Sequence, residues 1–231
     1  MLLDQTIAGR RCALWVPEGT GPFALSLCCC GSASELLPQL GALSPNRLFV
    51  SPEANWEIDF TPWPAPTLQG GRPFADGSVL GGAPAFLRWV EGELLPALAA
   101  QFALNPAQNS VLGYSLGGLF ALWAVCQSEA FSQCTCLSGS LWYPGWVNFL
   151  KEHAPKPPQR VYLSLGKKEE KSGPAVMRAV GDATRQSAGL LAQSLGCENT
   201  VLEWNPGGHF APALPRWEKA LAWLDFPQNN R

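Results

Sequence analysis

The chain has 231 residues, of which 47% are hydrophobic and 15% are charged, and its formal net charge is -2. This composition fits one sizeable hydrophobic core, and we expect a single domain over residues 1–231. No basic stripe or run of like charges is present, which argues against nucleic-acid or membrane-surface partners and favours a small molecule. Without a signal-peptide pattern or an apolar run of eighteen residues, we expect a cytoplasmic protein. The oligomeric state is left open.

The eight cysteines and two histidines bear on disulfides and metals. Cys28, Cys29 and Cys30 are consecutive in an apolar run, and Cys134 and Cys136 alternate in another. No Cys-x-x-Cys pair occurs, so we expect reduced core thiols rather than disulfides or a zinc site. The sequence implies no cofactor and no metal.

Apolar runs in the first fifty residues predict strands. Residues 6–17 read as one or two strands with a turn near Gly9, and residues 23–30 and 47–51 read as two more. These later runs are apolar throughout instead of alternating with polar residues. That pattern is typical of parallel strands covered on both faces.

Residues 52–82 lack a regular pattern and are rich in proline, glycine and aromatic residues. A loop of this length is commonly functional. A substrate-binding wall, a disordered insert and a misread element are the alternatives, and the aromatic residues count against disorder. We expect a pocket wall built from the aromatic residues Trp56, Phe60, Trp63 and Phe74, with packing over the sheet edge as the plainer alternative.

Helices and strands alternate through the second half of the chain. Residues 84–104 predict an amphipathic helix that Pro96 kinks or splits. The further predicted elements are strands at 131–137, 160–166 and 200–204 and helices at 116–128, 174–195 and 216–224. Such alternation predicts an α/β fold with a mostly parallel central sheet and helices on both faces.

The motif Gly-Tyr-Ser-Leu-Gly at residues 113–117 lies between a predicted strand and a predicted helix. A serine at the tip of a tight strand-to-helix turn needs small residues two positions before and after it. Gly113 and Gly117 meet this need, so we interpret Ser115 as a nucleophile. The alternative is chance, since the chain contains 23 glycines.

A serine nucleophile requires a base, which is usually histidine. His153 lies in a polar, proline-rich connector and is expected on the surface. His209 follows the last predicted strand, at the carboxyl edge where the turn at Ser115 also emerges. We therefore predict that His209 is the general base.

The orienting acid is expected between the serine and the histidine in sequence. Glu169, just after the strand at 160–166, is our choice, and Glu170 is the runner-up. A Lys-Lys-Glu-Glu-Lys segment is also what an ordinary solvated loop contains, so a dyad without an acid remains an alternative. Asp182 is expected inside a helix, and Asp225 follows the histidine.

The oxyanion hole requires two backbone donors. The Leu116 N–H, next after the nucleophile, is expected to supply one. Gly31 or Ser32, after the strand at 23–30, is expected to supply the other.

Further motifs resemble the putative-esterase branch of the α/β-hydrolases, which includes enterochelin (siderophore) esterases and esterase D-like enzymes. They are Asp-Phe-Thr-Pro-Trp at 59–63, Gly-Gly-Ala-Pro at 81–84, Ser-Gly-Ser-Leu-Trp-Tyr at 138–143 and Gly-Gly-His at 207–209. The resemblance covers most of the chain and implies an intracellular serine hydrolase that uses no metal. The chain departs from the siderophore esterases in lacking an arginine just before Asp59 and in having Cys28-Cys29-Cys30 where the family has Leu-Asp-Gly. A siderophore substrate is therefore not favoured.

We expect a serine esterase that hydrolyses a small-molecule carboxylic ester through an acyl-enzyme. Its substrate pocket is expected to include Phe60, Trp63, Tyr114 and Trp142. An acyltransferase using the same site and a non-catalytic ligand-binding protein of the same fold are the alternatives.

Overall fold

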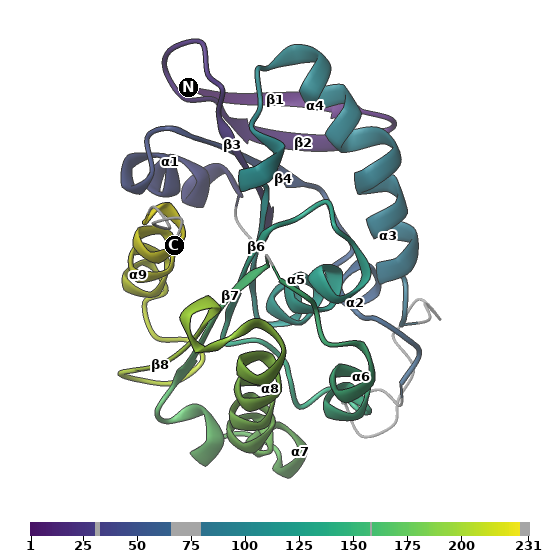
Figure 1. Cartoon of the computed structure of the whole chain (residues 1–231), viewed down its shortest axis with the longest axis vertical. Helices are drawn as coiled ribbons and strands as arrows, with labels where there is room; N and C mark the ends of the chain where they lie inside the picture. Colours follow the sequence, from purple (N-terminus) through teal and green to yellow (C-terminus); the bar gives the residue numbers. More distant parts are fainter. Residues whose placement is uncertain (31–32, 66–79, 158, 227–231) are drawn as a thin grey trace.

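The computed structural model describes residues 1–30, 33–65, 80–157 and 159–226. Within these residues one eight-stranded sheet has the order β1-β2-β4-β3-β5-β6-β7-β8 (Figure 1). The strands are β1 (Leu2–Ile7), β2 (Arg10–Trp15), β3 (Ala24–Cys29), β4 (Arg47–Pro52), β5 (Ser110–Tyr114), β6 (Gln133–Leu137), β7 (Arg160–Gly166) and β8 (Thr200–Asn205). β2 is antiparallel to both of its neighbours, and all other neighbouring pairs are parallel. The prediction of a mostly parallel sheet is confirmed.

Helices cover both faces of this sheet. The helices of the described residues are α1 (Ala33–Leu43), α2 (Trp56–Asp59), α3 (Ala83–Trp89), α4 (Leu95–Gln101), α5 (Leu116–Gln127), α6 (Trp146–His153), α7 (Ala175–Arg178), α8 (Val180–Leu195) and α9 (Leu214–Asp225), with a π-helical turn η1 (Val90–Leu94) and 3-10 turns η2 (Pro106–Gln108), η3 (Glu169–Lys171) and η4 (Cys197–Asn199). α1 and α9 pack on one face, on the left of Figure 1, and α3, α5, α6 and α8 pack on the other. The predicted helices on both faces are confirmed.

Each central strand supplies residues to both helical layers. Cys28 packs in the layer of α1 and α9, whereas Cys29 packs in the layer of α5. Successive side chains of a strand point to opposite faces, so a strand covered on both sides is apolar at most of its positions. All eight cysteines are free thiols, and burial raises the pKa of Cys28 and Cys29 well above its ordinary value.

Two predicted helices differ in form from the sequence-based expectation. The predicted helix at 84–104 is one run through α3, η1 and α4, so Pro96 neither ends nor splits it. Pro96 lies in the first turn of α4, directly after the π-helical turn, which shifts the hydrogen-bond pattern ahead of the proline. The predicted helix at 174–195 is divided into α7 and α8 at Ala179.

Neither α1 nor α6 was predicted. α1 contains Pro38 and Gly41, both of which are signals for the end of a helix. Its Leu37 and Leu40 are fully buried against the sheet, so tertiary packing overrides the local signals.

The segment 52–82 is partly ordered within the described residues, and 66–79 lie outside them. α2 occupies the part after β4, where Asn55 caps its first turn by accepting a hydrogen bond from the Ile58 N–H at 3.3 Å. Arg10 donates to Asp59 at 2.7 Å and ties α2 to β2. A short helix therefore stands where a continuous loop was expected.

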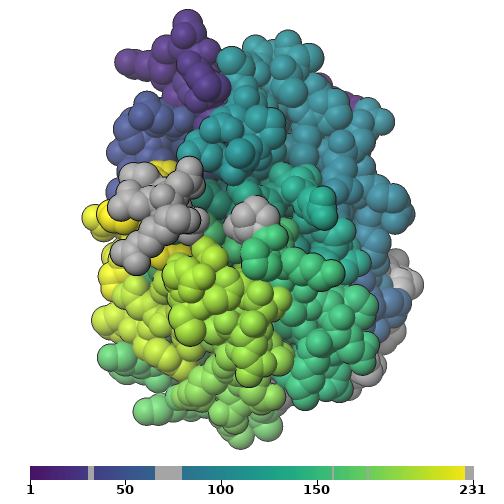
Figure 2. Space-filling view, viewed as in Figure 1, coloured from purple at the N-terminus to yellow at the C-terminus, as the bar shows by residue number. Residues whose placement is uncertain are grey.

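The sheet extends from one end of the molecule to the other. Figure 2 shows the N-terminal part of the chain at one end (purple) and the chain around α8 toward the opposite end (lime). No helix among the described residues combines the length and the apolar character needed to cross a bilayer.

Candidate active site

The turn from β5 to α5 holds Ser115 in an unusual backbone conformation, with φ 58° and ψ -123°. A β-carbon on Gly113 would lie 1.9 Å from the carbonyl oxygen of Gly117, and one on Gly117 would lie 1.8 Å from the carbonyl oxygen of Cys29. Both positions therefore exclude any side chain. The strained turn projects the Ser115 hydroxyl from the carboxyl edge of the sheet.

Three side chains meet at this edge. The Ser115 Oγ lies 3.1 Å from His209 Nε2, and His209 Nδ1 lies 2.9 Å from Glu169 Oε2. Glu169 begins η3 after β7, and His209 follows β8. Parallel neighbouring strands end at the same edge, and this brings together residues that are up to 94 positions apart.

Glu169 is held by its second carboxylate oxygen. Oε1 accepts hydrogen bonds from the Gly166 N–H at 2.7 Å, the Ser138 hydroxyl at 2.7 Å and Arg216 Nη1 at 3.1 Å. Burial by itself would raise the pKa of the Glu169 carboxyl, but the hydrogen bonds from His209, Ser138 and Gly166 outweigh it and lower that pKa. The side chain is therefore an ionised carboxylate at neutral pH.

Glu170, the alternative acid in sequence terms, faces away from His209. Its carboxylate pairs with Arg185 at 2.8 Å on the surface of α8. Of the other candidates, Asp182 is 82% exposed and also pairs with Arg185, and Asp225 pairs with Arg47 at 2.6 Å near the amino ends of the strands. His153 lies exposed at the end of α6, where it stacks on Phe149.

Arg216 connects the parts of this constellation and was not singled out from the sequence. Its guanidinium, 2% exposed, contacts Glu169, the Ser138 hydroxyl, the Tyr114 hydroxyl at 3.2 Å and the Gly208 carbonyl at 2.8 Å. It thus links the acid loop, the histidine loop and the end of β5. The only sequence signal was its place in the first turn of a helix directly after the histidine loop.

One predicted oxyanion donor is described and the other is not. Leu116 is the first residue of α5, so its N–H has no acceptor within the helix. Gly31 and Ser32 lie outside the described residues, and their role stays a prediction. Ser140 lies beside the nucleophile, with its Oγ 3.5 Å from the Ser115 Oγ and its N–H donating to the Ser115 carbonyl at 2.9 Å.

A cavity of about 200 Å³ opens beside Ser115. Among the described residues its walls include Trp56, Glu57, Thr61, Trp142, Tyr143 and Met177. The predicted Trp142 lies in this wall. Trp56, which belongs to the predicted aromatic wall, lies there too. Glu57 and Met177 were not predicted, and for Met177 the sequence offers no signal.

Phe60 and Trp63, both expected in the pocket, are not among the described residues that line this cavity. Phe60 is 3% exposed and packs on Phe86 and Phe120, with ring centroids 5.7 and 5.5 Å away. The Trp63 indole N–H donates to the Pro144 carbonyl at 2.8 Å, and its ring packs on Tyr143. Both rings therefore pack behind the residues that line the cavity. Phe60 does so because it follows the turn of α2, which directs its side chain into the core.

Comparison with known proteins agrees with this architecture. A family model described as "Putative esterase" matches residues 49–222 of the chain. The chain belongs to the putative esterase family.

Solved structures with the same fold include members of the branch that the sequence motifs resemble. The IroE-like serine hydrolase from Shewanella oneidensis is 19% identical with a TM-score of 0.79, over 96% of this chain and 79% of that one. Siderophore hydrolase EstA from Aspergillus nidulans is 16% identical with a TM-score of 0.73, over 96% and 93%. The enterobactin esterase FES from Shigella flexneri is 20% identical with a TM-score of 0.67, over 97% and 57%. The predicted resemblance and the α/β-hydrolase fold are confirmed.

A second cavity of this esterase-family chain, about 450 Å³, lies next to Tyr114, the residue before the nucleophile. Its described walls include Cys30, Glu35, Trp56, Tyr114, Leu214 and Trp217. Tyr114, expected in the substrate pocket, is among the residues that line this cavity, and its hydroxyl donates to the His209 carbonyl at 2.5 Å. Trp56 borders both cavities, whereas Ser115 is among the described lining of the smaller one alone.

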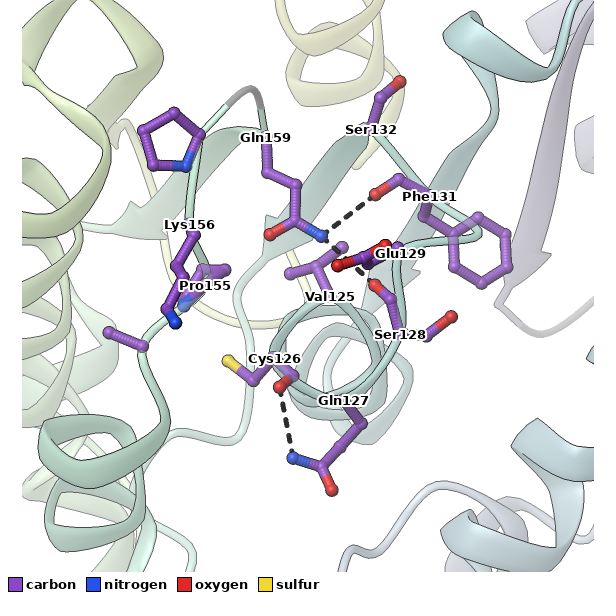
Figure 3. Close-up of a pocket in the computed structure, with 12 residues that line it drawn as sticks. Val125, Cys126, Gln127, Ser128, Glu129, Phe131, Ser132, Pro155, Lys156 and Gln159 are labelled. Atoms are coloured by element: carbon purple, nitrogen blue, oxygen red, sulfur yellow. Dashed lines mark hydrogen bonds between the residues drawn. The ribbon is translucent and has the colours of Figure 1, made fainter.

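A third hollow, about 480 Å³, lies near the amino ends of β6 and β7, away from Ser115 (Figure 3). Gln159 donates there to the Ser128 and Phe131 carbonyls at 3.1 and 3.2 Å. These bonds connect the chain before β7 to the end of α5, which is a structural role. The described residues that line this third hollow contain no pair of nucleophile and base. Elsewhere too, the described residues hold no cluster of three or more His, Cys, Asp or Glu placed to bind a metal ion.

Proposed function

We propose that this chain is a serine esterase that hydrolyses a small-molecule carboxylic ester through an acyl-enzyme. One observation carries the proposal: the hydrogen-bonded series from Ser115 Oγ through His209 to the buried Glu169 carboxylate. Membership of an esterase family and the names of the structural neighbours, which include a serine hydrolase and siderophore esterases, support the same reaction.

In the proposed acylation, the Ser115 oxygen attacks the ester carbonyl carbon while His209 Nε2 takes the hydroxyl proton. Glu169 accepts a hydrogen bond from His209 Nδ1–H, which keeps Nε2 free to accept that proton and stabilises the imidazolium. The oxyanion that forms on the former carbonyl oxygen faces the Leu116 N–H. Collapse of the intermediate breaks the bond to the alcohol oxygen, which leaves with the proton from His209.

In the proposed deacylation, a water molecule replaces the alcohol. His209 Nε2 removes a proton from the water as its oxygen attacks the acyl carbon. The second tetrahedral intermediate expels the Ser115 oxygen, which recovers the proton from His209. The products are the carboxylic acid and the free enzyme, so the same base serves both halves of the cycle.

The test combines turnover of short p-nitrophenyl esters with labelling by a fluorophosphonate. Ser115→Ala should lose both, since no other described serine contacts a histidine. Ser140→Ala is the matched control, because Ser140 lies in the same cavity without such a contact. Its labelled peptide should still contain Ser115. Equal turnover by wild type and Ser115→Ala would reject the proposal, and wild type that neither labels nor hydrolyses would indicate a binding protein.

A further inference from the structure

We propose that the cavity beside Ser115 receives a positively charged group of the ester, and that Glu57 selects for this charge. This inference rests on the proposed esterase function and names its substrate class as esters bearing an ammonium or quaternary ammonium group. It follows from what lines the cavity and from how Glu57 is held there.

The backbone of Glu57 is held at the cavity by a hydrogen bond, whereas its carboxylate makes no such bond to the described residues. Its carbonyl accepts a hydrogen bond from the Thr61 hydroxyl at 2.7 Å, and Thr61 in turn accepts one from the Gly81 N–H at 2.8 Å. The side chain is half-buried, and within the described part of the chain its carboxylate has neither a hydrogen-bond nor an ion-pair partner. A partly buried carboxylate without a counter-charge favours a cationic ligand.

The other carboxylate of α2 provides the contrast. Asp59, two residues further on, pairs with Arg10 at 2.7 Å and accepts a hydrogen bond from the Asn55 N–H at 3.0 Å. Asp59 therefore serves the folding of α2, and its charge is already compensated. The Glu57 carboxylate, also in the first turn of α2, has no such partner among the described residues, and its place in the cavity wall points to a ligand.

Aromatic side chains complete the environment of a cation. Trp56, Trp142 and Tyr143 line the same cavity, and the faces of such rings attract ammonium groups, most strongly those of tryptophan. The Tyr143 hydroxyl donates to the Trp63 carbonyl at 2.6 Å, which fixes this ring in the wall. A cavity of about 200 Å³ is large enough for a trimethylammonium group.

The surrounding charges point the same way. Neither lysine nor arginine occurs among the described residues lining this cavity or its larger neighbour, whereas the neighbour adds Glu35. An anionic group would therefore meet a carboxylate in either cavity without a compensating cation from the described walls. Esters of anionic acids or catecholates are predicted to be the poorer substrates.

The experiment compares esters of equal shape and different charge. Choline butyrate is paired with 3,3-dimethylbutyl butyrate, and a p-nitrophenyl ester with a trimethylammonium group in the acyl chain is paired with its tert-butyl analogue. In at least one pair, wild type should have a kcat/KM about tenfold higher for the cationic ester. Glu57→Gln should bring this ratio close to one, while Glu53→Gln, the same change at an exposed position outside the cavity, should preserve it.

A second readout does not depend on ester turnover. Tetramethylammonium chloride should slow fluorophosphonate labelling of wild type more than sodium chloride of equal ionic strength, and Glu57→Gln should abolish this difference. The inference would be overturned if the kcat/KM of the cationic ester did not exceed that of the neutral ester in either pair. It would also be overturned if Glu57→Gln left the ratio of these two kcat/KM values unchanged. Neutral esters would still be hydrolysed in that case, and the proposed esterase would stand. Loss of turnover and labelling with every reagent would instead reject the proposed function and this inference together.

Discussion

Replacing Glu169 by glutamine should reverse the tautomer of His209. In the native site Oε1 of Glu169 accepts from three donors, namely the Gly166 N–H, the Ser138 hydroxyl and Arg216. A glutamine must place its carbonyl oxygen at that position, because its NH₂ group would there face three hydrogen-bond donors. Its NH₂ group then faces His209 Nδ1 in place of Oε2.

An NH₂ donor at this position holds Nδ1 as an acceptor and puts the ring proton on Nε2. That nitrogen, 3.1 Å from the Ser115 Oγ, can then no longer accept the hydroxyl proton. Loss of the correct tautomer in a triad of this kind costs about 10³ to 10⁴ in kcat. At about 1.4 kcal/mol for each factor of ten, this corresponds to about 4 to 5.5 kcal/mol of transition-state stabilisation.

The assay is kcat and KM on p-nitrophenyl butyrate for wild type, Glu169→Gln and Glu170→Gln. The second variant removes the adjacent carboxylate, which pairs with Arg185 instead of His209, and it should stay within about twofold of wild type. KM should change little in Glu169→Gln, since the glutamine acts through His209. Circular dichroism at the assay temperature checks that both variants are folded. Retention of more than a tenth of the wild-type kcat by folded Glu169→Gln would refute the tautomer reasoning.

The remaining predictions concern stability. The lowered pKa of Glu169 adds stability that is fully present above the unfolded-state value of about 4.3 and is lost as pH falls through the folded-state value. Urea unfolding should therefore show wild type more stable than Glu169→Gln by about 3 kcal/mol at pH 7, with the difference shrinking below pH 4.5, and a constant difference would contradict this. Gly117→Ala should cost more than about 4 kcal/mol, because its β-carbon would lie 1.8 Å from the Cys29 carbonyl oxygen. Gly189→Ala in α8, where no heavy atom lies within 4 Å of the new carbon, should gain about 1 kcal/mol by thermal unfolding, and equal effects of the two alanines would refute the steric reasoning.

Local sequence patterns were enough to predict most strands of the sheet. Each predicted strand from residue 23 onward overlaps a strand of the structure, because runs of apolar residues closed by glycine or proline have few other stable arrangements in a chain of this size. α1 was missed for the opposite reason. Its proline and glycine signal a break, and only the burial of Leu37 and Leu40 against β-strands makes the helix favourable.

The residues of the pocket were likewise predicted only in part from the sequence. Trp142 was predicted to face the substrate and lines the cavity, whereas Phe60 supports the wall from the core. The aromatic content of residues 52–82 indicated that rings are buried there but not which ones. That choice depends on the rotation of α2, which is set by its cap at Asn55 and its ion pair with Arg10.

The sequence by itself determined the position of Ser115 at a strained turn. The backbone there has φ 58°, and the positions two before and two after Ser115 have no room for a β-carbon. Such a turn requires glycine at both positions, and the Gly-x-Ser-x-Gly pattern is visible in the sequence. The sequence also determined the place of His209, since the ends of parallel strands share one edge. Only the tertiary structure decided which of Glu169 and Glu170 contacts His209. Neighbouring residues of a 3-10 turn point about 120° apart, so one carboxylate turns inward to Ser138 and Arg216 while the other turns outward to Arg185. Those partners come from distant parts of the chain, and no local pattern encodes them.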